Sequence, residues 1–393
     1  MTMIGRASKM LQMKKGYAYP KAVGLHKIIG RISLKIHTFC VKEFLSMPLK
    51  ISWRKKTKTW WTWCLVCFCG LQLAAQGTAP APLFRDPITD GAADPVLIWN
   101  RQEQKWWMLY TQRRANLETA DVAYCYGTRI GVASAEDSCR TWVYRGTLDL
   151  DFEPGQQTYW APDVVYHQGE YHLFVVYIQG VRIHWGGQAR IAHYISKNLW
   201  DWRYLGFLKL SSDKVIDASL FQMPDGQWRM WYKDESRQSA IMMAKSADLY
   251  TWTHDDTPTL GLSAQEGPKI FHFKGYYWML TDEWKGMRVY RSSDATHWEK
   301  QGLILDGPSS RLEDTPSGAH GDVVVTGDQA WIFYFTHPGR DAHLFYSMDA
   351  QGIIPFQERR SSIQVAQLEV QQGDLVCDRN KPFRFFLPAP ENK

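Results

Sequence analysis

The 393-residue sequence has no apolar run long enough to cross a bilayer as a helix. A spanning helix needs about 20 apolar residues, and the longest apolar stretch, residues 60–73, is shorter. Low complexity is absent too, because 45% of residues are hydrophobic and 22% are charged. This composition is typical of a globular chain and excludes a collagen-like, disordered or polytopic membrane protein.

Acidic residues are nearly absent from the first 76 positions. Residues 1–76 hold 14 Lys and Arg and the single acid Glu43, whereas residues 77–393 hold 32 basic and 39 acidic residues. A nucleic-acid-binding domain needs a basic face on its folded part. The acidic body of the chain therefore argues against nucleic acid as a partner.

Residues 54–76 have the order of a secretory signal. They are basic from Arg54 to Lys58, apolar from Trp60 to Leu73, and end in Ala74-Ala75-Gln76. We therefore expect an upstream extension at 1–46, a signal peptide at 47–76, and a secreted or periplasmic protein without a stable membrane span. A buried helix or an uncleaved anchor is the alternative for the apolar stretch.

Cysteine is scarce after this leader, where only Cys125, Cys139 and Cys377 remain. In an oxidising compartment Cys125 and Cys139 are candidates for a disulfide. No two of the three lie within the spacing of zinc ligands, so no zinc site is expected. Tryptophan, in contrast, is abundant at 19 residues, and flat aromatic faces are suited to contacts with sugar rings.

One segment recurs five times: a polar or small residue at a strand start, a β-branched strand, a turn and an aromatic strand. The copies begin near residues 94, 161, 217, 266 and 320. A second element, Ser-x-Asp/Asn-x-x-x-Trp, follows at 196–202, 246–252 and 292–298. Such periodicity without long helical patterns predicts an all-β, five-bladed β-propeller over residues 77–360. Residues 361–393 are expected to supply a hairpin that packs on the propeller or completes its last blade; a β-sandwich is the alternative fold.

Inner strands of a propeller converge on its axis, so residues at equivalent strand starts meet in one funnel. Three of the five starts carry acids, Asp94, Asp217 and Glu266, and the other two carry Trp160 and His320. A single Asp at a strand start is usually a turn cap. Three acids at equivalent points of three repeats instead indicate a site.

These motifs resemble, in order and blade position, those of the family 43 glycoside hydrolases. The matching segments are Ala93-Asp94-Pro95, 160–164, 216–221, Glu266-Gly267-Pro268 and Ala319-His320-Gly321. The resemblance implies O-glycoside hydrolysis, with Asp94 as general base, Asp217 as the acid that orients and tunes the pKa, and Glu266 as general acid. It also implies that His320 lies in the central cavity near a bound calcium or a water cluster. Ala218 departs from the family, which usually has Pro after this Asp.

The chemistry of glycoside hydrolysis fits these residues. It needs a proton donor at the leaving oxygen and a base or nucleophile across the ring. An ionised neighbour raises the pKa of a donor carboxyl, and we expect Asp217 to do so for Glu266. Asp94 would then activate water and give inversion, with carboxyl groups roughly 6.5–9.5 Å apart. The motifs of retaining fructan-cleaving propellers, Asn-Asp-Pro and Arg-Asp-Pro, are missing from the corresponding blades.

Further side chains are candidates for sugar contacts, aromatic ones as platforms and polar ones as partners of hydroxyl groups. They are Trp160, Asp163, His184, Trp185, Asp282, Glu283, Trp284 and Arg113. The loop 179–188 is expected to form a wall of the cleft.

The predicted partner is an oligosaccharide or polysaccharide of plant or algal origin, attacked at chain ends. The chemistry requires no cofactor, although a structural calcium is expected in the central cavity beside His320. Two other functions remain open. One is a phosphorylase that binds phosphate through Arg113, Arg114 and Lys233; the other is a sugar-binding propeller without catalysis, which would not need all three acids.

Overall fold

The computed structural model describes residues 77–136, 139–261 and 265–390. The extension at 1–46 and the signal peptide at 47–76 lie outside these residues, and both stay predictions. Within the described ranges, no helix is long and apolar enough to span a membrane.

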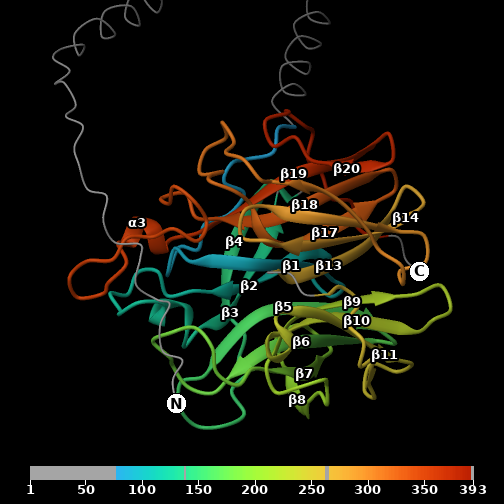
Figure 1. The fold of residues 1–393 in the computed structure, drawn as a ribbon, viewed down its shortest axis with the longest axis horizontal. Helices are drawn as coiled ribbons and strands as arrows, with labels where there is room; N and C mark the ends of the chain where they lie inside the picture. The colour runs from blue at the N-terminus through green and yellow to red at the C-terminus, as the bar shows by residue number, and fades with distance from the viewer. Residues whose placement is uncertain (1–76, 137–138, 262–264, 391–393) are drawn as a thin grey trace, which may run out of the picture. The chain divides into compact units, whose positions relative to one another are not determined.

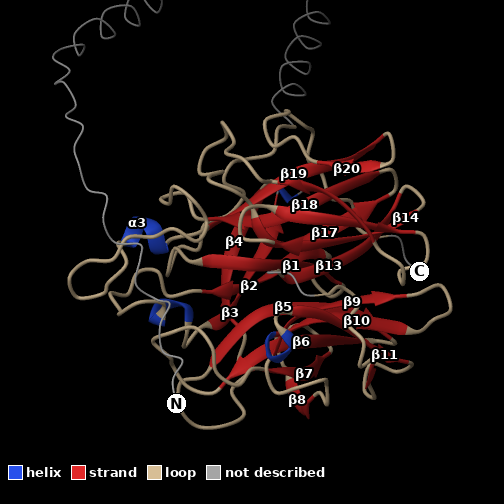
Figure 2. Cartoon of the chain, viewed as in Figure 1, coloured by secondary structure: helices blue, strands red, loops and turns tan. Residues whose placement is uncertain are grey.

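The described chain forms five four-stranded antiparallel sheets, each with its strands in sequence order (Figures 1 and 2). The first two contain β1 (Ala92–Asn100), β2 (Lys105–Gln112), β3 (Arg129–Glu136), β4 (Thr141–Thr147), β5 (Thr158–His167), β6 (Glu170–Ile178), β7 (Arg190–Ser196) and β8 (Arg203–Phe207). The third and fourth contain β9 (Val215–Gln222), β10 (Trp228–Asp234), β11 (Ala240–Ser246), β12 (Thr253–His254), β13 (Glu266–Phe273), β14 (Tyr276–Asp282), β15 (Met287–Ser292) and β16 (Glu299–Ile304). The fifth contains β17 (Ala319–Thr326), β18 (Gln329–Thr336), β19 (Ser362–Gln371) and β20 (Asp374–Val376). Short helical turns are η2 (Ala123–Cys125), η4 (Glu235–Arg237) and α3 (Phe356–Arg359).

The innermost strands contact one another in the order β1, β5, β9, β13, β17 and back to β1. This closed ring confirms the predicted all-β, five-bladed propeller. Each blade buries its aromatic second strand, and Trp107, Trp231, Trp278 and Trp331 are fully buried there. Large apolar side chains between sheets supply most of the stability of such a fold.

The expected boundary at residue 360 falls inside the fifth blade. Strand β19 pairs with β18, and β20 pairs with β19, so the segment expected at 361–393 completes this blade. The first described residues also bond to it, since the backbone N–H groups of Leu83 and Phe84 donate to the carbonyl of Ile363. Both ends of the described part of the chain therefore meet at one blade.

The repeated Ser-x-Asp/Asn element forms the turn before the outer strand, as its polar residues predict. In the second blade, Ser196 Oγ accepts from the N–H of Leu199, and Asn198 Oδ1 accepts from that of Trp200. The indole N–H of Trp202 then donates to the Leu199 carbonyl. The same contacts recur in the third blade.

Each inner strand contains a one-residue bulge near its start. The residues at the equivalent bulge position are Asp94, Ala161, Asp217, Gly267 and His320. The first four adopt a left-handed backbone, with φ between 41° and 59°. Bulges bend a strand and redirect its side chains, and here they direct the strand starts toward the axis.

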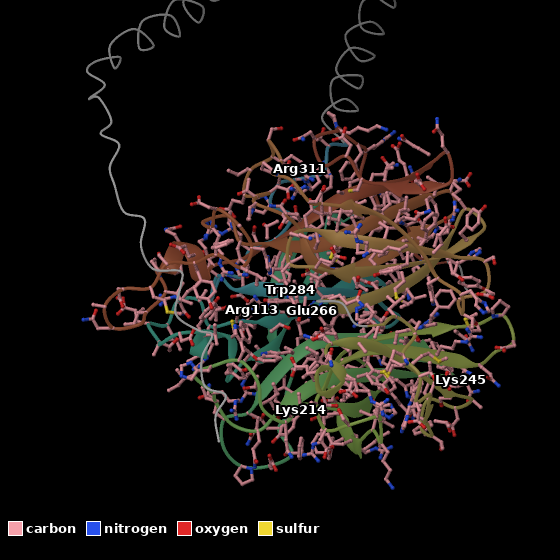
Figure 3. All side chains as sticks on the ribbon, viewed as in Figure 1. Arg113, Lys214, Lys245, Glu266, Trp284 and Arg311 are labelled. Carbon is pink, nitrogen blue, oxygen red and sulfur yellow. The ribbon has the colours of Figure 1, made fainter. Side chains whose placement is uncertain are left out.

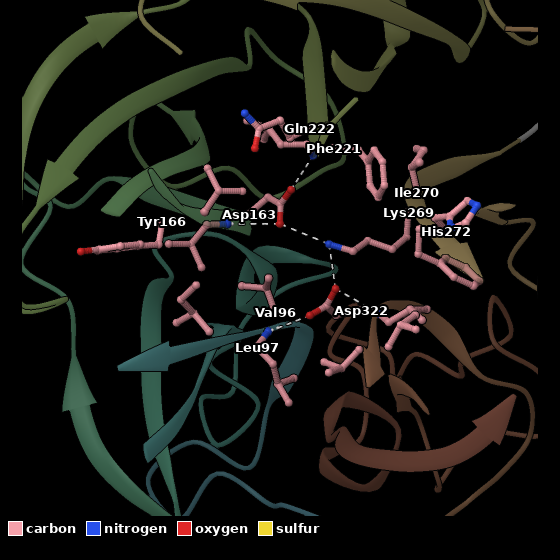
Figure 4. A pocket seen from close by; sticks show the side chains of 18 of the residues that line it. Val96, Leu97, Asp163, Tyr166, Phe221, Gln222, Lys269, Ile270, His272 and Asp322 are labelled. Atoms are coloured by element: carbon pink, nitrogen blue, oxygen red, sulfur yellow. Dashed lines mark hydrogen bonds and ion pairs between the residues drawn. The ribbon is translucent and has the colours of Figure 1, made fainter. Parts of the chain in front are cut away.

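A buried ion triad crosses the axis beyond the bulges (Figure 4). The Lys269 ammonium lies 2.7 Å from Asp322 Oδ1 and 3.3 Å from Asp163 Oδ1. All three side chains line a cavity of about 750 Å³. They are the first residues of their strands to line it, so the triad lies at the end of this cavity that faces the bulges.

We expect the substitution Lys269→Met to lower the free energy of unfolding by about 3–5 kcal/mol, because it leaves two carboxylates buried without a counter-ion. Chemical denaturation at pH 7 measures the change. The matched control is Lys274→Met, whose exposed ammonium pairs with the exposed Asp328 and whose loss should change stability little. Equal effects of the two substitutions would contradict the role of the triad.

Candidate active site

The three acids that the sequence analysis placed in one funnel line one cavity of about 470 Å³. Asp94 comes from the first blade, Asp217 from the third and Glu266 from the fourth. Figure 3 shows Glu266, Trp284 and Arg113 together at the centre of the molecule. The cavity is also lined by Trp160, Trp185, Lys233, Glu235, His320, His337, Arg340, His343 and Tyr346.

Asp94 is a buried carboxylate between two cations. Arg113 Nη2 lies 3.7 Å from Oδ2, and His320 Nδ1 lies 3.4 Å from Oδ1. Burial alone would raise the pKa of Asp94, but Arg113 and His320 favour its charged form and hold the pKa below the usual value. Asp94 is therefore ionised at neutral pH, which a general base requires.

His320 is correspondingly protonated. Burial would lower its pKa, but the hydrogen bond to Asp94 and the charges of Asp217 and Asp94 raise the pKa to about 9. Its backbone N–H donates to Asp282 Oδ2 over 3.0 Å. The imidazolium thus adds a positive charge between the carboxylates.

Asp217 and Glu266 are neighbours on adjacent blades and titrate as a pair. Burial and the charge of Glu266 raise the pKa of Asp217 to about 7. Burial would also raise the pKa of Glu266, but Lys233 and the Trp284 indole stabilise its charged form and lower the pKa. This order is the reverse of the expected one, because Lys233 lies beside Glu266, a contact that the sequence does not reveal.

Glu266 precedes the bulge position that Asp94 and Asp217 occupy in their own strands. Gly267 holds that position, with φ of +56°. A Cβ atom on Gly267 would lie 2.5 Å from ring atoms of His320. Glycine is therefore required at position 267 for two reasons, the left-handed backbone and the close contact with the imidazole.

Four of the residues predicted to contact sugar line the cavity, and four do not. Those that line it are Trp160, Trp185, Trp284 and Arg113. Trp160 donates its indole N–H to the Cys125 carbonyl, and Trp284 donates its own to Glu266 Oε1. The loop 179–188 contributes Trp185, Gly186 and Gly187, which places it as a wall of the cavity.

The remaining four, all described by the structure, lie outside the cavity lining. Asp163 belongs to the axial ion triad, and the exposed His184 bonds Asp121. Asp282 is buried below the cavity, where it accepts hydrogen bonds from the backbone of Trp284 and His320. Glu283 pairs with Arg288 through both of its oxygens. These four residues are therefore not part of the lining of the cavity that holds the three acids.

The cavity also contains residues that the sequence analysis missed or assigned to another role. Lys233 was assigned only to phosphate binding, and Glu235, His337, Arg340 and His343 were not considered. His337 and the residues after it follow the fifth aromatic strand, where the repeat pattern ends. No periodic signal marks them, so only their proximity in space reveals them.

Three loops join around one side of the cavity mouth. The N–H of Val122 donates to the carbonyl of Ile183, and the N–H of Asp121 donates to that of Gly352. These bonds connect loops of the first, second and fifth blades. The mouth is therefore walled on that side.

The pairing of Cys125 and Cys139, which the sequence left open, is not formed, because both are free thiols. Cys125 packs in a cluster with residues of the second and third blades, whereas Cys139 packs with residues of the first and fifth. Their proximity in sequence does not bring them to one interface.

The residues around His320 do not fit calcium, which prefers six to eight oxygen ligands. The imidazole Nδ1 lies 3.4 Å from Asp94 Oδ1, and the cations Arg113 and Lys233 line the same cavity. Within the ranges that the structure describes, no group of three His, Cys, Asp or Glu side chains is arranged to hold a metal ion.

We expect Gly267→Ala to destabilise the protein more than Gly275→Ala. Both glycines have positive φ, but a Cβ at Gly275 meets nothing within 4 Å. The left-handed backbone costs about 1–2 kcal/mol in each variant, and the clash with His320 adds about 1–3 kcal/mol in the first. Thermal unfolding measures both. An NMR titration should also show a lower His320 pKa in Gly267→Ala alone, since its ring is displaced from Asp94; an unchanged pKa would contradict this.

The comparisons with known proteins agree with this geometry. No curated protein matches the chain, but the profile of glycosyl hydrolases family 43 matches residues 145–346, just over half of the sequence. This range includes Asp217, Glu266 and His320, whereas Asp94 precedes it.

Solved structures of the family share the fold. A thermostable family 43 glycoside hydrolase is 17% identical with a TM-score of 0.55, and the alignment covers 79% of this chain and 100% of that one. A β-xylosidase/α-arabinofuranosidase from a compost microbial metagenome, solved with xylotriose in a calcium-free form, is 14% identical with a TM-score of 0.56. The alignment covers 76% of this chain and 97% of that one. An exo-β-1,3-galactanase from Phanerochaete chrysosporium, with β-1,3-galactotriose, is 14% identical with a TM-score of 0.55 and coverages of 74% and 63%. The chain belongs to glycosyl hydrolase family 43 and is a glycoside hydrolase.

Proposed function

We propose that the protein removes terminal sugars from oligosaccharides or polysaccharides of plant or algal origin, with inversion at the anomeric carbon. The observation that carries this proposal is the meeting of Asp94, Asp217 and Glu266, from three blades, around one cavity. The surroundings of the three acids also differ, and two different protonation states are what acid–base catalysis requires.

Asp94 is the proposed general base. It takes a proton from a water molecule while the water oxygen attacks the anomeric carbon and the bond to the leaving oxygen breaks. Arg113 and His320 keep the carboxylate ionised, so it is ready to accept the proton. Each cation lies near a different oxygen of the carboxylate, Arg113 near Oδ2 and His320 near Oδ1, and together they orient it.

Glu266 is the proposed general acid, which gives its proton to the leaving oxygen. The coupled pair of Asp217 and Glu266 supplies that proton, because the raised pKa of Asp217, about 7, lets the pair hold one proton near neutral pH. The proton passes from Asp217 to Glu266 when the charged form of Glu266 loses its stabilisation. Asp217 then regains a proton from solvent.

Action at chain ends is supported by two barriers near the cavity, one on the propeller axis and one in the loops. The triad of Lys269, Asp163 and Asp322 crosses the axis beyond the bulges, and the three joined loops wall one side of the mouth. A pocket with one open direction accepts a chain terminus more readily than a mid-chain segment.

Neutral sugars are the proposed substrates. Trp160, Trp185 and Trp284 line the cavity and offer apolar faces to a sugar ring. The structural relatives named above were solved with xylotriose and with β-1,3-galactotriose, and we extend these two sugar types to this chain as the first to test. The secretory pattern at 54–76 supports action outside the cytoplasm.

Phosphorolysis is less well supported than hydrolysis. Arg113 and Lys233 are each paired with a carboxylate, so neither is free for phosphate. Arg114 donates to the carbonyl of Ala123 and does not line the cavity.

We expect Asp94→Asn and Glu266→Gln each to lower kcat/KM by about 10²- to 10⁴-fold on xylotriose or β-1,3-galactotriose. The control is Glu299→Gln, an exposed acid paired with Arg291 on the outer strand β16, which should leave activity unchanged. NMR of the first product should show the inverted anomer. Retention of configuration, or turnover that requires phosphate, would contradict the proposal.

A further inference from the structure

Lys233 is a buried cation at the active site that neither the fold nor the proposed chemistry explains. It lies on β10 beside the bulge of β9 that holds Asp217, and its side chain is 5% exposed. Its ammonium is 3.0 Å from Glu266 Oε2 and 3.6 Å from Glu235 Oε1. The ammonium also faces the Trp284 ring, 5.6 Å from the ring centroid.

The two carboxylates around Lys233 differ in their surroundings. Glu266 is held from the other side by the Trp284 indole N–H, at 2.7 Å. Glu235 begins the short helix η4, lines the mouth of the cavity and is one-third exposed. The Glu266 side chain is 26% exposed and that of Glu235 is 34% exposed. The ammonium thus lies between a carboxylate that a second donor also holds and a slightly more exposed one.

This arrangement conflicts with the work of a general acid. Glu266 must carry a proton when the leaving oxygen departs, yet a cation at 3.0 Å and an N–H donor both favour its ionised form. The conflict disappears if the ammonium moves away from Glu266 during the reaction. Glu235 is the neighbouring anion that can receive it, since it already lies 3.6 Å away.

We propose that Lys233 is a positioning residue whose ammonium is shared between Glu266 and Glu235, and that its transfer toward Glu235 frees Glu266 to receive the proton that it donates. The inference rests on the general-acid role proposed for Glu266. Lys233 stays protonated throughout. The O–H bond on Asp217 breaks, a new one forms on Glu266, and this proton then passes to the leaving oxygen.

Other titratable or charged groups also face Glu266, and they are kept in every variant below. They are Asp217 on β9, Asp282 on β14, His320 on β17, Arg113 after β2 and His343 after β18. Any change between the variants therefore reports on Lys233 and Glu235.

The test is the pH dependence of kcat/KM for the wild type, Lys233→Met, Lys233→Arg and Glu235→Gln, with xylotriose or β-1,3-galactotriose as substrate. The alkaline limb of this profile reports loss of the proton from the general acid of the free enzyme. Removing the cation should move the limb to higher pH by about 1–3 units. Glu235→Gln should move it the opposite way, because the ammonium then stays on Glu266, and Lys233→Arg should restore the wild-type position.

An activated substrate provides an internal control. The leaving group of a 4-nitrophenyl glycoside needs little protonation, so the differences between variants should shrink with it. Circular dichroism and thermal unfolding check that each variant is folded. A rise in KM without movement of the limb would show that Lys233 contacts substrate instead, and would overturn the inference.

A titration of ¹³C-carboxyl-labelled glutamate by NMR separates this inference from the proposed function, because it follows Glu266 without turnover. A higher Glu266 pKa in Lys233→Met and a lower one in Glu235→Gln would support the inference even if no glycoside were cleaved. Cleavage by the wild type with the same Glu266 pKa in all variants would instead leave the function standing and refute the role of Lys233.

Discussion

The structure depends on hydrogen bonds that a backbone N–H of each blade donates to a side-chain oxygen of the preceding blade. Every junction of the ring has one. In order around the ring, the side chain of Thr111 accepts from the N–H of Ala161, Asp163 from Leu220, Asp217 from Gly267, Asp282 from His320, and Asp322 from Leu97. Four of the five acceptors are carboxyl groups, and a hydrogen bond to such a group contributes about 1.5–3 kcal/mol when the group is charged. These bonds fix the angle between sheets that otherwise meet through apolar contacts. The last blade bonds to the first in the same way, and the N–H groups of Leu83 and Phe84 add bonds to Ile363 of the last blade.

Two of these bonds link the stability of the ring to the chemistry of the site. Asp217 and Asp282 each serve as a junction acceptor, and burial with the nearby Glu266 raises the pKa of both to about 7. A carboxyl group that must stay buried to hold two blades together is thus also the group that retains a proton near neutral pH. The left-handed backbone at Asp94 and Asp217 has the same origin, because the bulge that directs the carboxylate inward requires it.

The repeat made the blades and the three acids predictable, whereas the partners of the acids were not. The sequence repeat shows where each inner strand begins. Asp94, Asp217 and Glu266 could therefore be placed in one funnel from sequence alone. Asp163 was misplaced because it lies two residues beyond the bulge position of its strand, on the opposite side of the cavity floor. Lys233 was missed as a partner of Glu266 because it lies on a second strand, and the contact depends on how neighbouring blades are rotated. Glu283 and His184 have the right chemistry, but their side chains are used by Arg288 and Asp121.

The order of the blades accounts for which acids interact. In a ring of five, the third and fourth blades are adjacent, so Asp217 and Glu266 influence each other directly. The first and fourth blades are separated by the fifth, whose inner strand contributes His320. The charge of this protonated imidazole favours the ionised forms of Asp94, Asp217 and Glu266. Of these three acids, the imidazole bonds only Asp94. On one side of the cavity Asp94 is therefore ionised, whereas on the other side Asp217 and Glu266 share one proton. A base and an acid can then act at the same pH although both are carboxyl groups, and the outcome does not depend on the distance between them along the chain.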